Sequence, residues 1–192
     1  MRLTSTVLRL VDVHCHLTAA SFKTDIASLI PSFKAAGLKH IILNGLDPMD
    51  NNRVFDLCDR FNLPNEPPFL LPATGIYPLN ACASVLYNLP PSEISNINME
   101  DFGEPFDADT EISRIGSWAA EKRIVAVGEC GLDNHYTTHP DAMKEQERVL
   151  RLLMRVAKKN DIPVILHSRK AEDRVFEMLL EGRPPCSVQH HA

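Results

Sequence analysis

The sequence predicts an α/β fold in which about six parallel strands are wrapped by helices. Apolar segments of strand length recur along the chain, and several are apolar on both faces, as parallel strands buried on both sides tend to be. Segments with helical spacing alternate with them, which favours parallel strands joined by helical crossovers. We expect the 192 residues to form one domain, residues 1–192.

Six segments are predicted to form the strands, and apolar spacing marks the helices between them. In DNNRVFDLCDRFN the apolar residues fall at i, i+3, i+4 and i+7, and KEQERVLRLLMRVAKKN repeats this spacing, so both are predicted helices. The predicted strands are VLRLVDVH (7–14), HIILNGL (40–46), FLLPATGI (69–76), RIVAVGE (123–129), IPVILH (162–167) and CSVQHH (186–191).

Two segments depart from this rhythm. Pro31 interrupts the first helical stretch and predicts a kink or two short helices. Residues 79–110 are polar, acidic and contain three prolines, so we expect a long surface excursion before a helix around Trp118. This excursion could be an ordered lid or a disordered acidic loop.

Composition describes an ordinary globular protein, with 44% apolar and 23% charged residues. The net charge of −5 provides no basic surface for nucleic acid, so a phosphate substrate would need bound cations or a few arginines. The five scattered cysteines form no CxxC pair, which argues against a disulfide framework. No segment is apolar enough to span a membrane. We expect a cytoplasmic protein, with the nucleus as the alternative.

Ligand-type residues gather where the predicted strands end. His14 and His16 end the first strand, Glu129 the fourth and His167 the fifth. Because parallel strands place their carboxyl ends at one edge, these side chains should converge there. Imidazoles with a carboxylate suit zinc, manganese or cobalt. A lone HxH pair is more often accidental, but a buried carboxylate such as Glu129 costs several kcal/mol unless it is paired or metal-bound.

Three motifs carry a resemblance to a known family. VDVHCHL resembles the DxHxH opening of metal-dependent TIM-barrel hydrolases, and VAVGECGLD and IPVILHSRKAEDRVFEML are similar to signatures of the TatD metal-dependent deoxyribonucleases. The resemblance implies a (β/α)8 TIM barrel, of which about six β/α units are present. Such a barrel typically needs about 250 residues.

The resemblance also implies roles for individual residues. His14 and His16 would bind a first divalent metal ion, and His167 a second. Glu129 would bridge the two ions, which could be Mg, Mn or Zn, and would be catalytic. Arg169 would be catalytic too and would contact the substrate phosphate, although a surface salt bridge is the alternative.

The resemblance leaves the choice of one histidine open and departs from the family at one tyrosine. The histidine that closes the following strand in the family could be His191, which we prefer, or His190. Tyr77 stands in GIYP where the family usually has GxHP, and we expect it to contact substrate rather than metal.

The implied activity is phosphodiester hydrolysis on DNA ends, with DNA as partner and no membrane. The sequence ends before the last family strand, which carries an aspartate. We therefore expect a C-terminally incomplete domain with weak activity, and self-association through open sheet edges. Two alternatives remain: an amidohydrolase-like hydrolase of C–N or C–O bonds, and a non-catalytic relative that binds metal or a partner.

Overall fold

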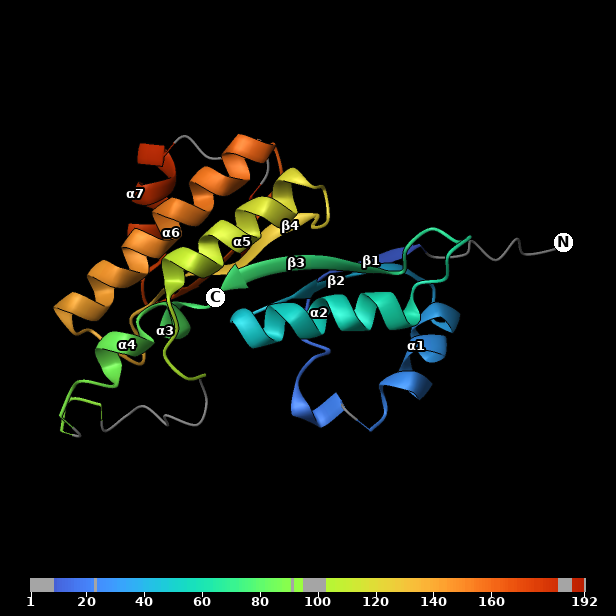
Figure 1. The fold of residues 1–192 in the computed structure, drawn as a ribbon, viewed down its shortest axis with the longest axis horizontal. Helices are drawn as coiled ribbons and strands as arrows, with labels where there is room; N and C mark the ends of the chain where they lie inside the picture. Colours follow the sequence, from blue (N-terminus) through green and yellow to red (C-terminus); the bar gives the residue numbers. More distant parts are fainter. Residues whose placement is uncertain (1–8, 23, 91, 95–102, 183–187, 192) are drawn as a thin grey trace, which may run out of the picture.

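A computed structural model describes residues 9–22, 24–90, 92–94, 103–182 and 188–191 (Figure 1). Its six strands form one sheet in chain order, and every neighbouring pair is parallel, which confirms the predicted fold class. The strands are β1 (Leu10–Cys15), β2 (Leu38–Asn44), β3 (Leu70–Ile76), β4 (Ala126–Asp133), β5 (Val164–Arg169) and β6 (Val188–His191).

Helices connect the strands, as the alternating sequence pattern predicts. No helix within the described ranges is both long and apolar enough to cross a membrane. The helices are a short 3₁₀ turn η1 (Ala20–Phe22), α1 (Ile26–Ala35), α2 (Pro48–Phe61), α3 (Pro78–Ala81), α4 (Ala83–Leu86), α5 (Ala108–Ala120), α6 (Pro140–Asn160) and α7 (Glu172–Gly182).

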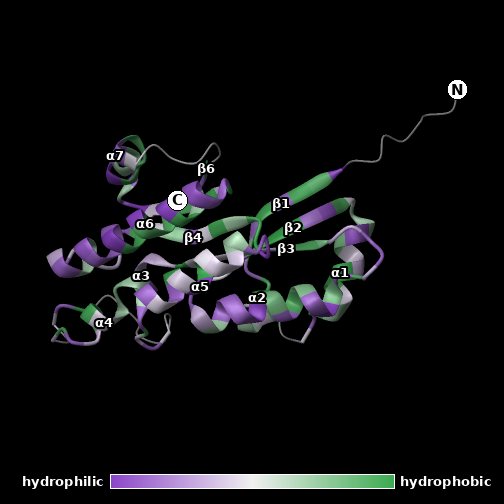
Figure 2. Cartoon of the chain, turned by 45° about the horizontal axis from the view of Figure 1, so that its top comes forward, coloured by the Kyte–Doolittle hydropathy of each residue, from purple (hydrophilic) through white to green (hydrophobic). Residues whose placement is uncertain are grey.

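The sheet curls into a half-barrel with helices packed along its length. In Figure 1, α1 and α2 lie against the part formed by β1 to β3, and α5, α6 and α7 gather beside β4. The helices carry hydrophobic and hydrophilic stretches side by side in Figure 2, as helices with one buried face do. β1 and β6 are the two edge strands of the sheet.

Strand alternation separates an outer core from the inner face of the half-barrel. On β5, Val164 and Leu166 join the large core that packs against α5, α6 and α7. Ile165 lies between them and belongs to a separate small cluster with Ala73 and Ala126. Since successive strand side chains point to opposite faces, His167 shares the inner face with Ile165. The inner face therefore carries the candidate ligand.

The structure excludes two separate helices at Pro31 and corrects the expectation for the start of residues 79–110. α1 runs without a break through Pro31, and both Pro31 and Ala27, whose carbonyl loses its helical partner, are exposed to solvent that can satisfy it. The start of the expected surface excursion is packed instead of exposed. A small core there consists of Leu79, Cys82, Ala83, Leu86 and Ala142. Residues 91 and 95–102 lie outside the described ranges, so the choice between lid and loop stays open.

The predicted end of β4 is also wrong. We expected the strand to end at Glu129, but it continues to Asp133, in register with β5 up to Arg169. Glu129 therefore lies in the middle of a strand and is only 3% exposed. In the sequence, the glycines at 128 and 131 suggest that the strand ends there. In the structure they lie inside β4, where the absence of a side chain allows close approach to β5.

Candidate metal centre

Two histidines of β1 and a glutamate of β4 form a compact group of ligand-type atoms. Nε2 of His14 lies 3.2 Å, and Nε2 of His16 2.9 Å, from Oε2 of Glu129. The two imidazole nitrogens are 3.0 Å apart, and all three groups offer a ligand atom within 4.8 Å of the others. The sequence predicted that these side chains converge, and the sheet brings them together.

Neighbouring strands hold the two histidines. His16 lies just past the end of β1, and its Nδ1 lies 3.0 Å from the backbone carbonyl of Asn44 at the end of β2. Since a carbonyl only accepts, this contact places a proton on Nδ1 and leaves Nε2 to face Glu129. The backbone N–H of His14 donates to Asp12, which fixes the strand end locally.

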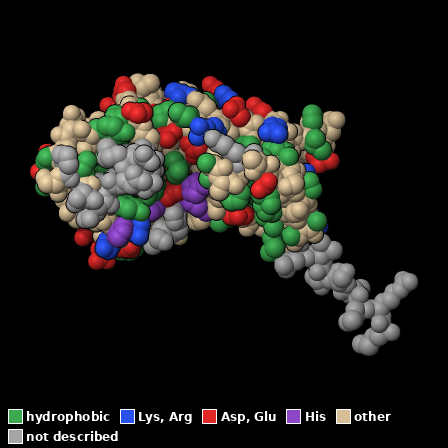
Figure 3. Space-filling model, turned by 90° about the horizontal axis from the view of Figure 1, so that it is seen from below, with side chains coloured by type: hydrophobic (Ala, Val, Ile, Leu, Met, Phe, Trp, Pro, Cys, Tyr) green, Lys and Arg blue, Asp and Glu red, His purple; other side chains and the backbone are tan. Residues whose placement is uncertain are grey.

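The second carboxylate oxygen of Glu129 faces a third histidine. Oε1 lies 2.9 Å from Nδ1 of His167 on β5, opposite the oxygen that faces His14 and His16. One buried carboxylate thus lies between imidazoles of two distant strands. Figure 3 shows histidine side chains gathered around a hollow in the middle of one face, with acidic atoms inside it.

The electrostatics of this group favour positive charge. Burial lowers the pKa of His16, but the hydrogen bond to Glu129 and its negative charge outweigh burial and raise the pKa above its usual value. His167 is also buried, yet hydrogen bonds to Asp133 and Glu129 raise its pKa to about 9. A centre that attracts protons in this way also suits a cation, and two imidazoles with one carboxylate are suitable ligands for borderline divalent metals.

Comparison with known proteins identifies the family. A family model described as TatD related DNase matches residues 11–192. The chain belongs to the TatD family. It is 27% identical over 172 residues to an uncharacterized metal-dependent hydrolase, YabD, of Bacillus subtilis, which covers 90% of this chain and 55% of the relative. It is also 27% identical over 174 residues to deoxyribonuclease TATDN3 of Homo sapiens, covering 90% and 56% respectively.

Solved structures agree with this assignment. The TatD homolog YJJV of Escherichia coli superposes with a TM-score of 0.66 and 25% identity, covering 93% of this chain and 58% of that one. A TatD family hydrolase of Entamoeba histolytica, at 18% identity, shows the same fold with the same TM-score and covers 93% and 56%. The chain spans just over half the length of the relatives it matches.

One polar residue of this TatD-family site was missed in the sequence. Asp133 is fully buried, and its Oδ2 lies 3.1 Å from Nε2 of His167. Burial alone would raise its pKa, but the bond from His167 and backbone N–H groups of the following loop lower it, so the carboxylate stays charged. The motif GECGLD contained the signal, since Asp133 closes the strand that carries Glu129. A strand that ends at Glu129, as predicted, leaves Asp133 in a loop, whereas β4 continues four residues further.

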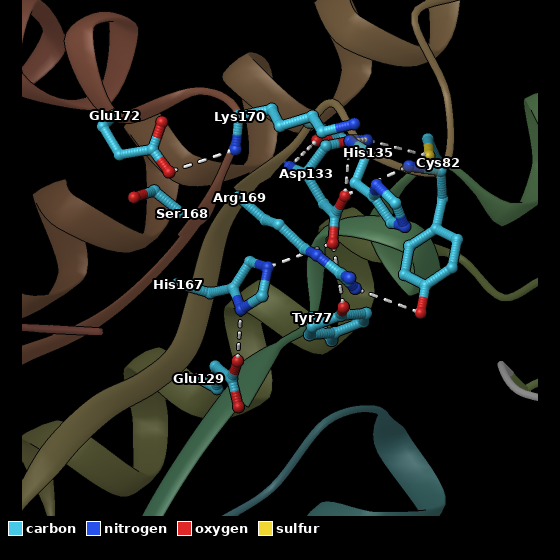
Figure 4. Close-up of polar contacts among 12 residues, drawn as sticks. Tyr77, Cys82, Glu129, Asp133, His135, His167, Ser168, Arg169, Lys170 and Glu172 are labelled. Carbon is cyan, nitrogen blue, oxygen red and sulfur yellow. Dashed lines mark hydrogen bonds and ion pairs between the residues drawn. The ribbon is translucent and has the colours of Figure 1, made fainter. Parts of the chain in front are cut away.

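Tyr77 and Arg169 lie beside this group (Figure 4). The Tyr77 hydroxyl donates to Oδ2 of Asp133 at 3.2 Å, and its ring packs edge-on against His167. Burial and the neighbouring Asp133 raise the pKa of Tyr77, so it stays a hydrogen-bond donor. Arg169 donates to the hydroxyl of Tyr136 at 3.2 Å, and its guanidinium lies over that ring.

The two closing histidines occupy different positions. His190 pairs in register with Leu166, and its Nε2 lies within hydrogen-bond distance of the Ser168 hydroxyl, so the structure does not bring it to Glu129. The backbone of His191 pairs in register with His167.

Proposed function

We propose that this chain carries the metal-binding centre of a phosphodiesterase that acts on DNA. The position of Glu129 supports this proposal most strongly. Its Oε2 faces His14 and His16 while its Oε1 faces His167, which is the arrangement expected of a carboxylate that bridges two cations. The proposed centre holds two divalent ions, of magnesium, manganese or zinc.

The residues divide between the two ions. His14 and His16 would bind one ion with Oε2 of Glu129, and His167 would bind the other through Nδ1 with Oε1. When bound, the ions would polarise the phosphodiester and stabilise the negative charge that develops as it is cleaved. Glu129 would fix the separation of the two positions, because both of its oxygens come from one buried side chain.

The sheet register favours His191 over His190 as a further ligand. Position 191 is in register with His167, and residues in register on parallel strands share a face of the sheet. Position 190 is in register with Leu166, which belongs to the outer core. We therefore assign His191 to the second ion.

Arg169 is the proposed contact to the substrate phosphate. Among the described residues it forms no ion pair with a carboxylate, so the structure gives no support to the salt-bridge alternative. Tyr136 holds one nitrogen of the guanidinium, and the group follows His167 on the same strand by two residues. A planar guanidinium can bind phosphate through two parallel hydrogen bonds.

The choice of DNA as substrate rests on relatives. One is named a deoxyribonuclease, and another, from Pectobacterium carotovorum, is named a 3'-5' ssDNA/RNA exonuclease at 25% identity. Bound cations would supply the positive charge that a chain of net charge −5 lacks. We propose trimming of single-stranded DNA ends as the activity.

Elemental analysis and a nuclease assay test the proposal. The chain purified without chelator should contain zinc or manganese, and Glu129→Gln, which preserves the shape of the side chain, should lose most of it. His40→Gln is the matched control, because His40 lies near the amino end of β2, where its Nδ1 lies 2.9 Å from the backbone carbonyl of Pro68. The protein should degrade DNA with magnesium or manganese, and EDTA should abolish this activity. Equal metal content in the wild type and both variants would overturn the proposal. So would a protein that cleaves amides or lactones but leaves DNA intact.

A further inference from the structure

Asp133 receives four hydrogen bonds, which divide between its two oxygens. Oδ1 accepts the backbone N–H groups of His135 and Tyr136, at 2.8 and 3.3 Å. Oδ2 faces Nε2 of His167 at 3.1 Å and accepts the Tyr77 hydroxyl at 3.2 Å (Figure 4). The side chain is fully buried, so these contacts fix both its position and its orientation.

We propose that Asp133 is a positioning residue that sets which nitrogen of His167 is available to a metal ion. The inference rests on the proposed function, since it concerns the ion that His167 would bind. An ionised carboxylate only accepts hydrogen bonds, so the nitrogen that faces it, Nε2, must carry a proton. The other nitrogen, Nδ1, faces a second carboxylate, so without an ion it carries a proton too; a bound ion would replace that proton and use the lone pair of Nδ1. This is the nitrogen that faces Glu129.

Tyr77 acts through Asp133 in this arrangement. Its hydroxyl shares Oδ2 with His167, and its ring packs on the imidazole with centroids 5.0 Å apart. It therefore holds the carboxylate and the ring in one relative orientation. Replacing a carboxylate that orients a metal-binding histidine typically lowers metal affinity about 10–100-fold.

The substitution Asp133→Asn would reverse whether Nε2 of His167 donates or accepts, with almost no change in the shape of the side chain. The two backbone N–H groups require an oxygen at the Oδ1 position. The amide nitrogen must then occupy the Oδ2 position, where it donates to Nε2 of His167. Nε2 becomes an acceptor, the one remaining ring proton lies on Nδ1, and Nδ1 has no lone pair for an ion.

Cobalt titration followed by visible absorption and nitrogen NMR of labelled histidine test the inference. In the zinc-loaded wild-type chain, we expect protonated Nε2 and metal-bound Nδ1 at His167. Asp133→Asn should bind Co²⁺ about 10–100-fold more weakly. Tyr77→Phe should keep the proton on Nε2 and show a smaller loss. Asp141→Asn, at an exposed site paired with Lys144, is the control and should bind like the wild type.

The readouts separate this inference from the proposed function. If no protein binds metal, the proposed function fails, and the protonation of Nε2 of His167 in metal-free protein at neutral pH decides the inference. A protonated Nε2 in the wild type and an unprotonated Nε2 in Asp133→Asn support it. The same protonation of Nε2 in both proteins, or equal cobalt affinity in folded Asp133→Asn, overturns it. Circular dichroism establishes that each variant is folded.

Discussion

Gly131 of β4 lies directly against the backbone carbonyl of His167 on β5, so that a Cβ at position 131 would collide with it. The absence of a side chain at Gly131 therefore sets the spacing of the two strands beside the proposed metal centre. Gly131→Ala should destabilise the chain by about 1–3 kcal/mol, which is typical of forced overpacking. Thermal unfolding followed by circular dichroism measures the change.

Gly116 offers a control of opposite sign. It lies inside α5, and a Cβ there would meet only the Val156 side chain, at an ordinary contact distance of 3.8 Å. Gly116→Ala should stabilise the chain by about 0.5–1 kcal/mol, because alanine loses less backbone entropy in a helix. If Gly131→Ala unfolds at the same temperature as the wild type, β4 and β5 can accommodate a Cβ at position 131, and the proposed close packing is wrong.

The proposed phosphate contact can be tested through the Michaelis constant for DNA. Arg169→Ala should raise this constant about tenfold, equivalent to about 1.4 kcal/mol, and Arg169→Lys should raise it less because the charge remains. Arg155→Ala, at an exposed position of α6, removes the same charge and should have little effect. An equal rise for Arg155→Ala would indicate long-range attraction instead of a specific contact.

The packing of α6 on α7 should depend on pH through Glu147. Arg174 donates to both of its carboxylate oxygens at 2.7 Å, and this contact lowers the pKa of Glu147 below 4.5. A lowered folded-state pKa gives stability that is present above pH 4.5 and lost as pH falls through the folded value. Because the pair is partly exposed, Glu147→Gln should lower the free energy of unfolding by only about 0.5 kcal/mol at neutral pH. In strong acid the substitution should not change it. Urea titrations at several pH values measure this, and a difference independent of pH would argue against the ion pair.

The edge strand β1 exposes apolar side chains, which predicts self-association of the 192-residue chain. Val11 and Val13 are 53% and 44% exposed, and an unpaired apolar edge favours pairing with another copy. Size-exclusion chromatography with light scattering should find dimers or larger species, and Val11→Lys should shift them toward monomer. A wild-type chain that remains monomeric at high concentration would contradict this prediction.

Alternation of apolar segments determined much of the fold without any structure. Strands of a parallel sheet are apolar on both faces and helices on one, so each of the six strands could be located within a few residues. The candidate ligands His14, His16 and His167 were also visible in the sequence. Each of these histidines follows a buried apolar segment, and a parallel sheet brings the residues at its strand ends to one edge. Their convergence could therefore be predicted from the sequence.

Only the tertiary structure decided how these residues meet. It showed that Glu129 lies within β4, that Asp133 closes that strand against His167, and that position 191, not 190, is in register with His167. It also showed that Tyr77 contacts Asp133. These contacts depend on the register between strands more than 20 residues apart in the sequence. A shift of one residue moves every side chain to the opposite face, and local sequence does not fix that register.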